Sequence, residues 1–407
     1  MIDLTRLVRG IDNRPEEMRY ENREQEESLI PLVVWNMTPA CNLTCAHCYF
    51  GAIDRRADDE LTTEEAKILI DDLAAANVPV LVFSGGEPML REDLPELAAY
   101  ASEQGVRPIA SSNGTYLTEE LAHELAEAGM AYVGISLDGV GETHDEFRGR
   151  DGCFDDAVQG IRNAQAAGMS TGIRSTMTVD TIDDLPNLFD LSLELGVDRL
   201  NVFHLIYAGR GDEITDRDLE FDATREMVEY LFERTLEFAD SNPDMQVLSA
   251  GNYADAVFLY NKIEAEMPER AERARELLLD EGPARVVKKG DSGPKVVNVD
   301  HRGDVHPSMF LSNITMGNIR TRPLGEILDE SEVWQKLANA GKHVEGRCGK
   351  CEYKTVCGGN SRARANAVNG DLWASDPRCY LSDEEIGLSD SCNSSRTERP
   401  TLQSGEI

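Results

Sequence analysis

Short apolar runs alternate with amphipathic stretches through the first half of the chain. From Leu32 onward the apolar runs predict strands, and the stretches between them gather apolar residues on one helical face. The predicted strands are 32–35, 80–83, 106–110, 132–137, 171–178 and 199–205. The predicted helices are 62–76, 93–103, 118–128, 154–167, 182–195 and, after the last strand, 219–240. Several of these helices begin at a Thr or Asp cap candidate and end near Gly.

This alternation predicts βαβ units and a parallel sheet, and therefore a fold of the α/β class. Six strands are too few for the closed eight-stranded barrel, so we expect a partial (β/α)6 barrel with a wide lateral opening. In parallel barrels the chemistry lies at the carboxyl ends of the strands. Four polar segments follow strands and are expected to meet at that rim: 41–48, 84–88, 111–115 and 136–139.

The remainder of the chain is expected to form smaller units. Residues 1–30 are polar and charged, although Leu4, Leu7 and Val8 suit a short docking helix. Residues 264–293 are charged and then carry Gly, Pro and Lys, which indicates a domain boundary. The predicted units are a polar arm at 1–30, the barrel at 31–240, a helical linker at 241–293, a small C-terminal domain at 294–386 and a disordered tail at 387–407.

The net charge of the chain limits the kinds of partner that it can bind. Asp and Glu number 75 against 40 Lys and Arg in 407 residues, a net charge of −35. This balance argues against nucleic acid, because phosphate binding needs a basic face. The acidity is spread along the chain, as in proteins from high-salt cytoplasms, so it indicates habitat more than substrate. No segment approaches the roughly 20 apolar residues of a membrane span, and no signal-peptide pattern is present, so we expect a soluble, cytoplasmic protein without a membrane partner.

The nine cysteines lie at short spacings, which in an intracellular protein favours metal over disulfides. Cys41, Cys45 and Cys48 form a C-x3-C-x2-C pattern directly after the first strand. Three thiolates leave one iron of a four-iron cluster without a protein ligand, and an open iron can bind a substrate or cofactor. Zinc is the alternative, although it needs four ligands and this loop adds only His47, between two of the cysteines.

A second cysteine group lies near the C-terminus. The segments 295–300 and 304–307 flank the short turn 301–303 and predict a hairpin ahead of this group. Four further thiolates, enough to close a cluster completely, are supplied by Cys348, Cys351, Cys357 and Cys379. Tetrahedral zinc suits four thiolates equally well by count. Only Cys153 and Cys392 remain outside the two groups.

The first cysteine group, with Ser-Gly-Gly-Glu-Pro at 84–88, resembles the radical S-adenosylmethionine (SAM) superfamily. In that family the methionine part of SAM chelates the open iron, and one electron cleaves SAM to a 5′-deoxyadenosyl radical that takes hydrogen from substrate. The resemblance implies a 4Fe-4S cluster, SAM and a ferredoxin- or flavodoxin-like electron donor. The C-terminal part resembles the SPASM auxiliary-cluster domain, which implies an auxiliary 4Fe-4S cluster on the second cysteine group.

The SAM assignment gives the rim residues physical roles. His47 is expected beside the adenine, Glu87 to accept hydrogen bonds from the methionine ammonium, and Arg148 to pair with the methionine carboxylate. The further expected contacts are Gly85 and Gly86, for close backbone approach, and Ser112, Asn113 and Ser136, for ribose and methionine. The alternative for any one of them is a turn residue or a surface ion pair.

Over nearly its whole length the chain resembles the NirJ, AhbC and AhbD group, radical SAM enzymes that trim siroheme-derived tetrapyrroles in haem biosynthesis. The likeness is sharpest at 207–211, 251–255, 298–300, 303–307, 357–364, 370–373 and 376–387. It implies an iron tetrapyrrole substrate and removal of acetate groups from 12,18-didecarboxysiroheme to give Fe-coproporphyrin III. The alternative within the group is oxidative propionate decarboxylation, as in a haem synthase or in formation of a haem d-type precursor.

The end of the sixth strand carries candidate substrate contacts. His204, Tyr207 and Arg210 suit a flat anionic substrate, since the planar fork of Arg binds both oxygens of a carboxylate. A capped strand end with a surface Arg is the alternative. His204 and His306 are candidate axial ligands of the iron, although a lone His more often has an ordinary structural role.

Two other functions stay open. A peptide-modifying SPASM maturase would use the same two cluster sites, but is expected to carry an N-terminal peptide-binding segment for which residues 1–30 are too short. The second of these functions is that of a non-catalytic iron-sulfur scaffold or electron carrier.

Overall fold

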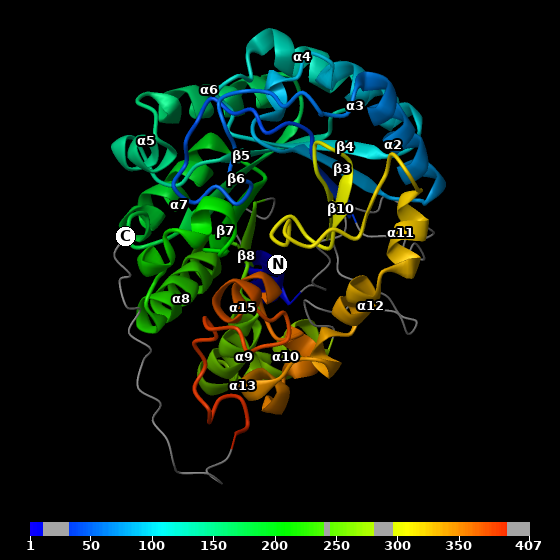
Figure 1. The fold of residues 1–407 in the computed structure, drawn as a ribbon. Helices are drawn as coiled ribbons and strands as arrows, with labels where there is room; N and C mark the ends of the chain where they lie inside the picture. The colour runs from blue at the N-terminus through cyan, green and yellow to red at the C-terminus, as the bar shows by residue number, and fades with distance from the viewer. Residues whose placement is uncertain (11–31, 240–244, 281–295, 389–407) are drawn as a thin grey trace, which may run out of the picture.

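The computed structural model describes residues 1–10, 32–239, 245–280 and 296–388, in which a curved sheet is covered by helices (Figure 1). The strands are β1 (Ile2–Asp3), β2 (Leu32–Asn36), β3 (Val80–Ser84), β4 (Arg107–Ser112), β5 (Tyr132–Ser136), β6 (Ser170–Met177), β7 (Arg199–His204), β8 (Gln246–Ala250), β9 (Val296–Val299), β10 (Asp304–His306) and β11 (Gly317–Asn318). The helices are α1 (Leu4–Arg9), α2 (Thr63–Ala75), α3 (Leu94–Glu103), α4 (Glu119–Glu127), α5 (Glu142–Arg148), α6 (Cys153–Ala166), α7 (Leu185–Leu195), α8 (Phe221–Phe238), α9 (Ala254–Glu266), α10 (Ala271–Arg275), α11 (Leu324–Glu330), α12 (Glu332–Ala338), α13 (Gly346–Lys350), α14 (Lys354–Cys357) and α15 (Arg362–Asn369).

The six predicted strands all form, and β2 to β7 pair with their neighbours in parallel. The predicted helices correspond to α2, α3, α4, α6, α7 and α8, each within a few residues of the expected bounds. Helices α2, α3, α4 and α6 lie along the outer side of the curved sheet, which leaves its inner side to side chains from the strands and rim loops (Figure 1). The α/β partial barrel expected from the sequence is therefore confirmed.

The sheet continues beyond those six strands at both edges. Strand β8 pairs in parallel with β7, and β1 pairs antiparallel with β8. At the other edge β9 pairs in parallel with β2 and turns into β10 as the predicted hairpin. In the described ranges the sheet order is β1-β8-β7-β6-β5-β4-β3-β2-β9-β10-β11.

Strand β8 lies inside the range 241–293, which the sequence predicts as a helical linker. Helices α9 and α10 lie in the same range, so the strand is an addition to the predicted helices. Only Val247 and Leu248 are strongly apolar in β8, so the run is too short to stand out as a strand. Residues 281–293 of the predicted linker lie outside the described ranges.

Cap residues explain where two of the outer helices begin. Thr62 accepts a hydrogen bond from the Glu65 N–H, and the Glu65 carboxylate accepts one from the Thr62 N–H, which together form a capping box for α2. Thr118 caps α4 by accepting from the backbone of its first turn. Asp93 precedes α3 without capping it, because its carboxylate pairs with Arg91 at 2.6 Å.

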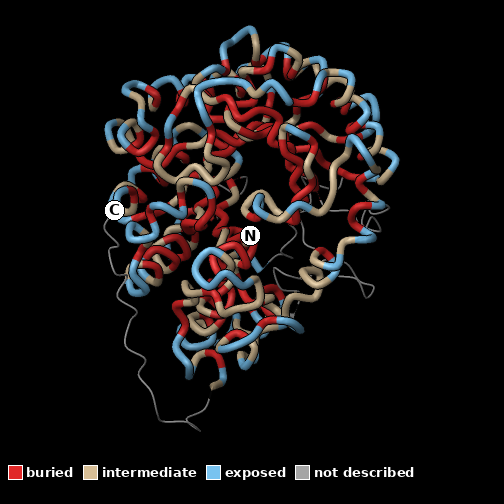
Figure 2. The backbone as a smooth tube through the Cα atoms, viewed as in Figure 1, coloured by how far each residue is buried: buried red, intermediate tan, exposed pale blue. Residues whose placement is uncertain are grey.

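Both faces of β2 and β3 are buried, as is usual for strands of a parallel sheet. In β2, Val33 and Trp35 join the main core beneath the helices, whereas Leu32 and Val34 face the other way and pack near Met309. Figure 2 shows the buried residues gathered along the strands and the exposed residues on the outer turns of the helices.

The first residues of the chain also join the core. Leu4 and Leu7 of α1 are buried in it and Val8 packs against it, which confirms the short docking helix. The rest of the predicted arm, residues 11–30, and the tail from residue 389 lie outside the described ranges. Among the helices that the structure describes, none combines the length and the apolar character needed to cross a bilayer.

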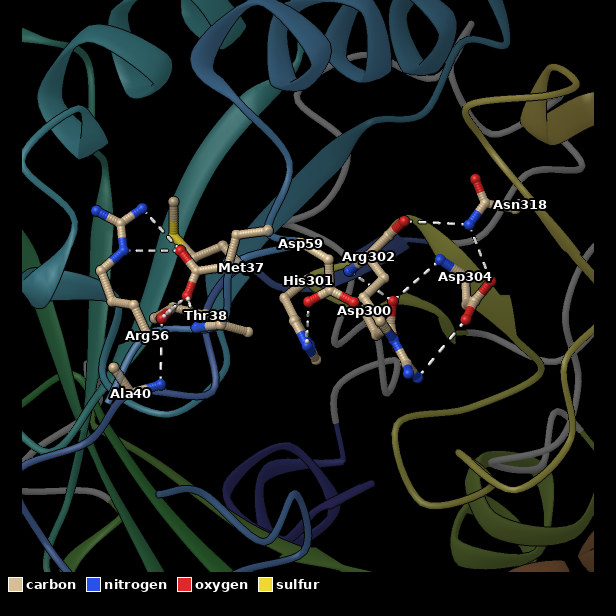
Figure 3. A network of polar contacts seen from close by, with 12 residues as sticks. Met37, Thr38, Ala40, Arg56, Asp59, Asp300, His301, Arg302, Asp304 and Asn318 are labelled. Atoms are coloured by element: carbon tan, nitrogen blue, oxygen red, sulfur yellow. Dashed lines mark hydrogen bonds and ion pairs between the residues drawn. The ribbon is translucent and has the colours of Figure 1, made fainter. Parts of the chain in front are cut away.

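The C-terminal part, from β9 to α15, runs along the open side of the curved sheet (Figure 1). Polar contacts tie its hairpin to the loop after β2 (Figure 3). The Leu61 N–H donates to the His301 carbonyl at 2.8 Å, and His301 Nε2 lies 3.9 Å from a carboxylate oxygen of Asp59. Arg320 pairs with Glu65 at 2.7 Å. The hairpin is therefore docked beside the first rim loop.

Candidate active site

The loop after β2 brings its three cysteines together at the rim of the sheet. Cys41, Cys45 and Cys48 pack into one cluster beside Cys153 of α6 and line a cavity of about 150 Å³. The Cys41 N–H donates to the Ile53 carbonyl at 2.7 Å, and the Cys48 N–H to the Cys45 carbonyl at 3.3 Å. The three sulfurs predicted to act together therefore share one site.

Each of these sulfurs has an N–H donor. Backbone nitrogens lie 3.4 Å from the sulfurs of Cys41 and Cys48. Asn113 Nδ2 lies 3.7 Å from the Cys41 sulfur, and Arg148 Nη1 lies 3.6 Å from the Cys45 sulfur. Such donors stabilise thiolates and tune the clusters that thiolates hold, so this donor set fits iron-sulfur ligation.

Burial keeps the thiols of Cys41 and Cys45 neutral when no metal is bound. It raises the pKa of Cys41 to about 12, and it also raises the pKa of Cys45. Because thiolates are the metal ligands, binding of iron is coupled to release of their protons.

Gly85 and Gly86, directly after β3, allow the cysteine loop to pack closely against the end of that strand. A Cβ on Gly86 would lie 2.0 Å from the Ala40 carbonyl oxygen, and a Cβ on Gly85 would lie 2.6 Å from that of Thr38. The Gly86 N–H donates to the Thr38 carbonyl at 2.7 Å. The sequence assigns these glycines to close approach of a ligand, and both do line the cavity. The contacts give them a second purpose, which is to hold the cysteine loop against β3.

Glu87 lies behind the cavity wall. Its carboxylate accepts hydrogen bonds from Ser112 Oγ at 2.7 Å, from the Asn113 N–H at 2.7 Å and from the Met89 N–H at 3.1 Å. Burial raises its pKa to about 6, although these hydrogen bonds oppose the rise. Ser112 and Asn113 line the cavity and Glu87 does not. The described contacts of Glu87 are thus with the protein, and they fix the two neighbours that face the cavity.

Asp138, which follows β5, organises the charged side of the site. Its carboxylate lies 2.5 Å from Arg148 Nη2 and 3.5 Å from His47 Nε2, and accepts the Thr176 N–H at 2.6 Å. Burial works against the charge on Arg148, but Asp138 outweighs it and raises the pKa of the guanidinium. Burial lowers the pKa of His47 to about 4, so the ring is neutral at neutral pH. His47 stacks on Phe147 with 4.7 Å between ring centres.

The predicted SAM contacts mostly meet at the cavity. Those that line it are His47, Gly85, Gly86, Ser112, Asn113, Ser136 and Arg148. Three buried polar atoms of its wall have no hydrogen-bond partner in the described structure, namely His47 Nδ1, Arg148 Nε and Arg210 Nη2. Buried polar groups without partners are uncommon in proteins, and here all three belong to residues that line the cavity, where a polar ligand can supply partners.

The predicted substrate residues divide into two pairs. His204 and Arg210 line the cavity, whereas Tyr207 and His306 do not. The Tyr207 hydroxyl donates to Asp218 at 2.8 Å. His306 Nδ1 lies 2.9 Å from the Ile314 carbonyl oxygen and its ring is buried in the C-terminal part.

Arg210 is tied mainly to the cysteine loop. Its Nε donates to the Cys45 carbonyl and its Nη1 to the Ala52 carbonyl, both at 2.8 Å. Only Nη2 is left without a partner among the described residues. Gly209 makes this approach possible, since a Cβ there would lie 2.5 Å from the Cys48 carbonyl oxygen.

Sequence reasoning missed Arg174 and Asp138. Arg174 sits in the middle of β6, lines the cavity, donates to Ser111 Oγ at 2.8 Å and lies over the Phe203 ring at 5.2 Å. A charged residue inside a strand whose other residues are all uncharged is the signal that marks it.

Met309 and Phe310, from the loop after β10, also line the cavity.

The second cysteine group forms a separate small site. Cys348, Cys351, Cys357 and Cys379 line one cavity of about 20 Å³. Arg347 Nη1 lies 3.3 Å from the Cys379 sulfur, and a backbone nitrogen lies 3.3 Å from the Cys351 sulfur. The four thiols come from short helices and loops between α13 and the end of the described chain.

Neither cysteine group forms a compact site for one ion. In the part of the chain that the structure describes, no three His, Cys, Asp or Glu side chains converge closely enough to hold a single metal ion. Each thiolate of a four-iron cluster binds a different iron, so its ligands lie further apart than those of one ion. Cys153 is buried beside the first group, and Cys392 lies outside the described residues.

A polar interface connects the two sites. Asn360, just after Cys357, donates from Nδ2 to Asn252 Oδ1 at 2.6 Å. Arg364 is fully buried, pairs with Asp376 at 2.9 Å and donates to the Leu205 carbonyl at 3.0 Å. The segments 251–255, 357–364 and 376–387, prominent in the sequence, therefore join the end of β7 and the start of α9 to the auxiliary site.

Comparison with known proteins agrees with this geometry. The radical SAM superfamily profile matches residues 35–192, and that of an iron-sulfur cluster-binding domain, SPASM, matches residues 292–352. The chain belongs to the radical SAM enzymes, with a C-terminal SPASM domain. A solved structure of anSMEcpe with bound AdoMet has the same fold, with a TM-score of 0.66, 19% identity, and coverage of 88% of this chain and 96% of that one.

Within this superfamily the chain is similar to several enzymes whose names place them in haem synthesis. The chain is 42% identical to Fe-coproporphyrin III synthase of Methanosarcina barkeri, over 95% of this chain and 99% of that protein. It is 38% identical to pre-heme d1 synthase of Dinoroseobacter shibae, over 88% of each chain. It is 34% identical to AdoMet-dependent heme synthase of Methanosarcina barkeri, over 86% of this chain and 95% of that protein. The chain is thus a radical SAM/SPASM enzyme of the haem-biosynthesis group.

The cofactors of this group are a SAM-binding 4Fe-4S cluster, SAM and an auxiliary iron-sulfur cluster, and the residues present fit them. The first cavity offers three thiols with N–H donors and the unpartnered polar atoms of His47, Arg148 and Arg210. The second offers four thiols, which can saturate a cluster. We assign Cys41, Cys45 and Cys48 to the first cluster as a proposal, and the four C-terminal cysteines to the auxiliary cluster in the same way.

Proposed function

We propose that this protein removes acetate side chains from 12,18-didecarboxysiroheme to give Fe-coproporphyrin III. The observation that carries the proposal is the wall of the first cavity, which Arg174 and Arg210 line together with Phe203 and Phe310; Nη2 of Arg210 has no partner among the described residues. Guanidinium groups bind carboxylates through a planar fork, and aromatic rings pack on flat apolar surfaces. A tetrapyrrole carrying several carboxylates combines both features. The 42% identity to a Fe-coproporphyrin III synthase favours acetate removal over the other steps of the group.

The side chains of the cavity hold and enclose the reacting groups. When bound, the cluster and SAM supply a radical that can take hydrogen from a substrate side chain. Arg148, neutralised by Asp138, places a donor beside the Cys45 sulfur. Met309 and Phe310 close the cavity from the C-terminal side, so the auxiliary domain contributes to excluding water.

The test is an anaerobic incubation of the reconstituted protein with SAM and dithionite. Didecarboxysiroheme, Fe-coproporphyrin III and an unrelated peptide are offered separately, and mass spectrometry follows each. We expect only didecarboxysiroheme to change, by loss of its two remaining acetate groups, together with formation of 5′-deoxyadenosine. Cys48→Ser, prepared identically, should form neither product.

The alternatives predict different results. A mass change of Fe-coproporphyrin III would instead indicate propionate decarboxylation, as in a haem synthase. A change of the peptide alone would contradict the tetrapyrrole assignment. Absence of deoxyadenosine from a sample with a full complement of iron would indicate a non-catalytic iron-sulfur protein.

A further inference from the structure

His204, the last residue of β7, is held by a buried carboxylate. Its Nε2 lies 2.9 Å from Asp255 Oδ2, and the Asp255 side chain is fully buried at the start of α9. The same carboxylate accepts hydrogen bonds from Ser249 Oγ and, at 2.8 Å, from the Tyr380 hydroxyl. Three donors from different elements thus fix the carboxylate, and the carboxylate fixes the ring of His204.

This arrangement determines which nitrogen of His204 is available. A carboxylate accepts hydrogen bonds, so Nε2 carries the ring proton and Nδ1 keeps its lone pair. Nδ1 makes no hydrogen bond within the described residues, and His204 lines the first cavity. A histidine that binds a metal in a protein typically donates its other ring N–H to a carboxylate, which orients the ring and raises its basicity.

We propose that His204 binds the iron of the tetrapyrrole substrate through Nδ1, and that Asp255 is the positioning residue for this bond. The proposal rests on the proposed function, because it requires an iron tetrapyrrole in the first cavity. It separates the two histidines that the sequence left as equal candidates. His306 Nδ1 is in hydrogen-bonding contact with the Ile314 carbonyl oxygen, and its Nε2 lies 3.7 Å from a carboxylate oxygen of Asp300. His306 does not line the cavity.

The same carboxylate also reaches the auxiliary site. Tyr380, which donates to Asp255, directly follows Cys379 in the sequence, and Cys379 lines the second cavity. A short buried path of hydrogen bonds and one peptide unit therefore leads from the proposed iron ligand to a cysteine assigned to the auxiliary cluster. Docking of the auxiliary domain is needed to complete the support of His204, because Tyr380 comes from that domain.

The test uses the anaerobically reconstituted full chain with Fe-coproporphyrin III as the probe. Resonance Raman spectra of the ferrous complex, excited in the Soret band, report an iron–histidine stretch when an imidazole is bound. We expect the wild-type complex to show this stretch and His204→Ala to lose it while keeping its iron-sulfur content. Added imidazole should restore an axial nitrogen ligand in His204→Ala. We expect Asp255→Asn to keep the stretch at lower frequency and to weaken binding on the order of 10-fold.

His306→Ala is the matched control, and its complex should keep the wild-type spectrum. The inference is overturned if His204→Ala retains the stretch, or if the wild type binds Fe-coproporphyrin III without any iron–histidine stretch. An unchanged frequency in Asp255→Asn would overturn the positioning role of Asp255. Failure of the wild type to bind the probe at all would contradict the proposed function itself, and the inference with it.

Discussion

Asp138 and Arg148 form a buried ion pair, with 2.5 Å between Oδ2 and Nη2, beside the sulfur of Cys45. The sequence predicts that the Arg148 guanidinium pairs with the carboxylate of SAM. In the structure it already has a protein carboxylate and a sulfur as neighbours, and only Nε lacks a partner among the described residues. Arg148 therefore connects the cysteine loop to β5 and also borders the space for the cofactor.

Replacement of Asp138 by Asn should destabilise the chain strongly. It leaves Arg148 buried without its counter-charge, and loss of one partner of a buried pair costs about 3–5 kcal/mol. The matched control is Asp156→Asn, which breaks an ion pair with Arg150 that lies at the surface. A surface pair is worth about 1 kcal/mol or less. Urea unfolding of the cluster-free protein measures both, and equal losses in the two variants would contradict the assignment of Asp138.

The pH dependence of stability should depend on His144. Burial lowers its pKa to about 4, while its Nδ1 accepts the Asp138 N–H at 3.1 Å. The unfolded chain binds a proton on this histidine near pH 6.5 and the folded chain does not, so stability is full above that pH and falls as the pH drops towards 4. His144→Asn keeps an acceptor at the same position and should flatten this fall, by about 3 kcal/mol at most.

The control for this prediction is the same exchange at His123, which is exposed on α4. His123→Asn should reproduce the wild-type profile of unfolding free energy against pH. If His144→Asn and the wild type lost stability in parallel between pH 6.5 and 4, protonation of His144 would not be the cause.

The outcome at individual residues shows what the sequence can and cannot reveal. The strands and the cysteine spacings are local patterns, and their places in the fold were predictable. The orientation of Tyr207 was not, because it depends on Asp218 lying nearby to accept its hydroxyl. Arg174 was overlooked since its contacts with Ser111 and Phe203 exist only once β4, β6 and β7 are assembled. Glu87 likewise matched its motif, but only the fold shows that Ser112 and Asn113 occupy its oxygens.

Close packing of Gly86 should make it sensitive to a single methyl group. In Gly86→Ala the new Cβ would lie 2.0 Å from the Ala40 carbonyl oxygen, so the cysteine loop must move. Overpacking of this kind costs typically 1–3 kcal/mol. We expect lower stability and incomplete iron loading of the first site after anaerobic reconstitution. Gly325→Ala on α11, where the added methyl meets no atom within 4 Å, is the control and should load normally.

Iron analysis can separate the two cysteine groups. Two 4Fe-4S clusters correspond to about eight irons per chain. Cys45→Ala should reduce the content to about four, and Cys357→Ala should do the same, because each removes a ligand of a different cluster. Cys153→Ala is the control, since Cys153 is buried beside the first group but is assigned to neither cluster. Stoichiometric zinc in place of iron at either site would contradict the assignment of that site.

Arg174 provides a test of the cavity wall that is independent of the iron. We expect Arg174→Gln to raise the dissociation constant of Fe-coproporphyrin III by at least about tenfold, because a charged hydrogen bond to a carboxylate contributes roughly 1.5–3 kcal/mol. The loss should shrink at high ionic strength, where wild-type binding weakens as well. Arg162→Gln, on the exposed side of α6, removes the same charge away from the cavity and is the control. Titrations followed by absorbance give both constants, and equal affinities in the two variants would show that the carboxylates of the ligand are bound elsewhere.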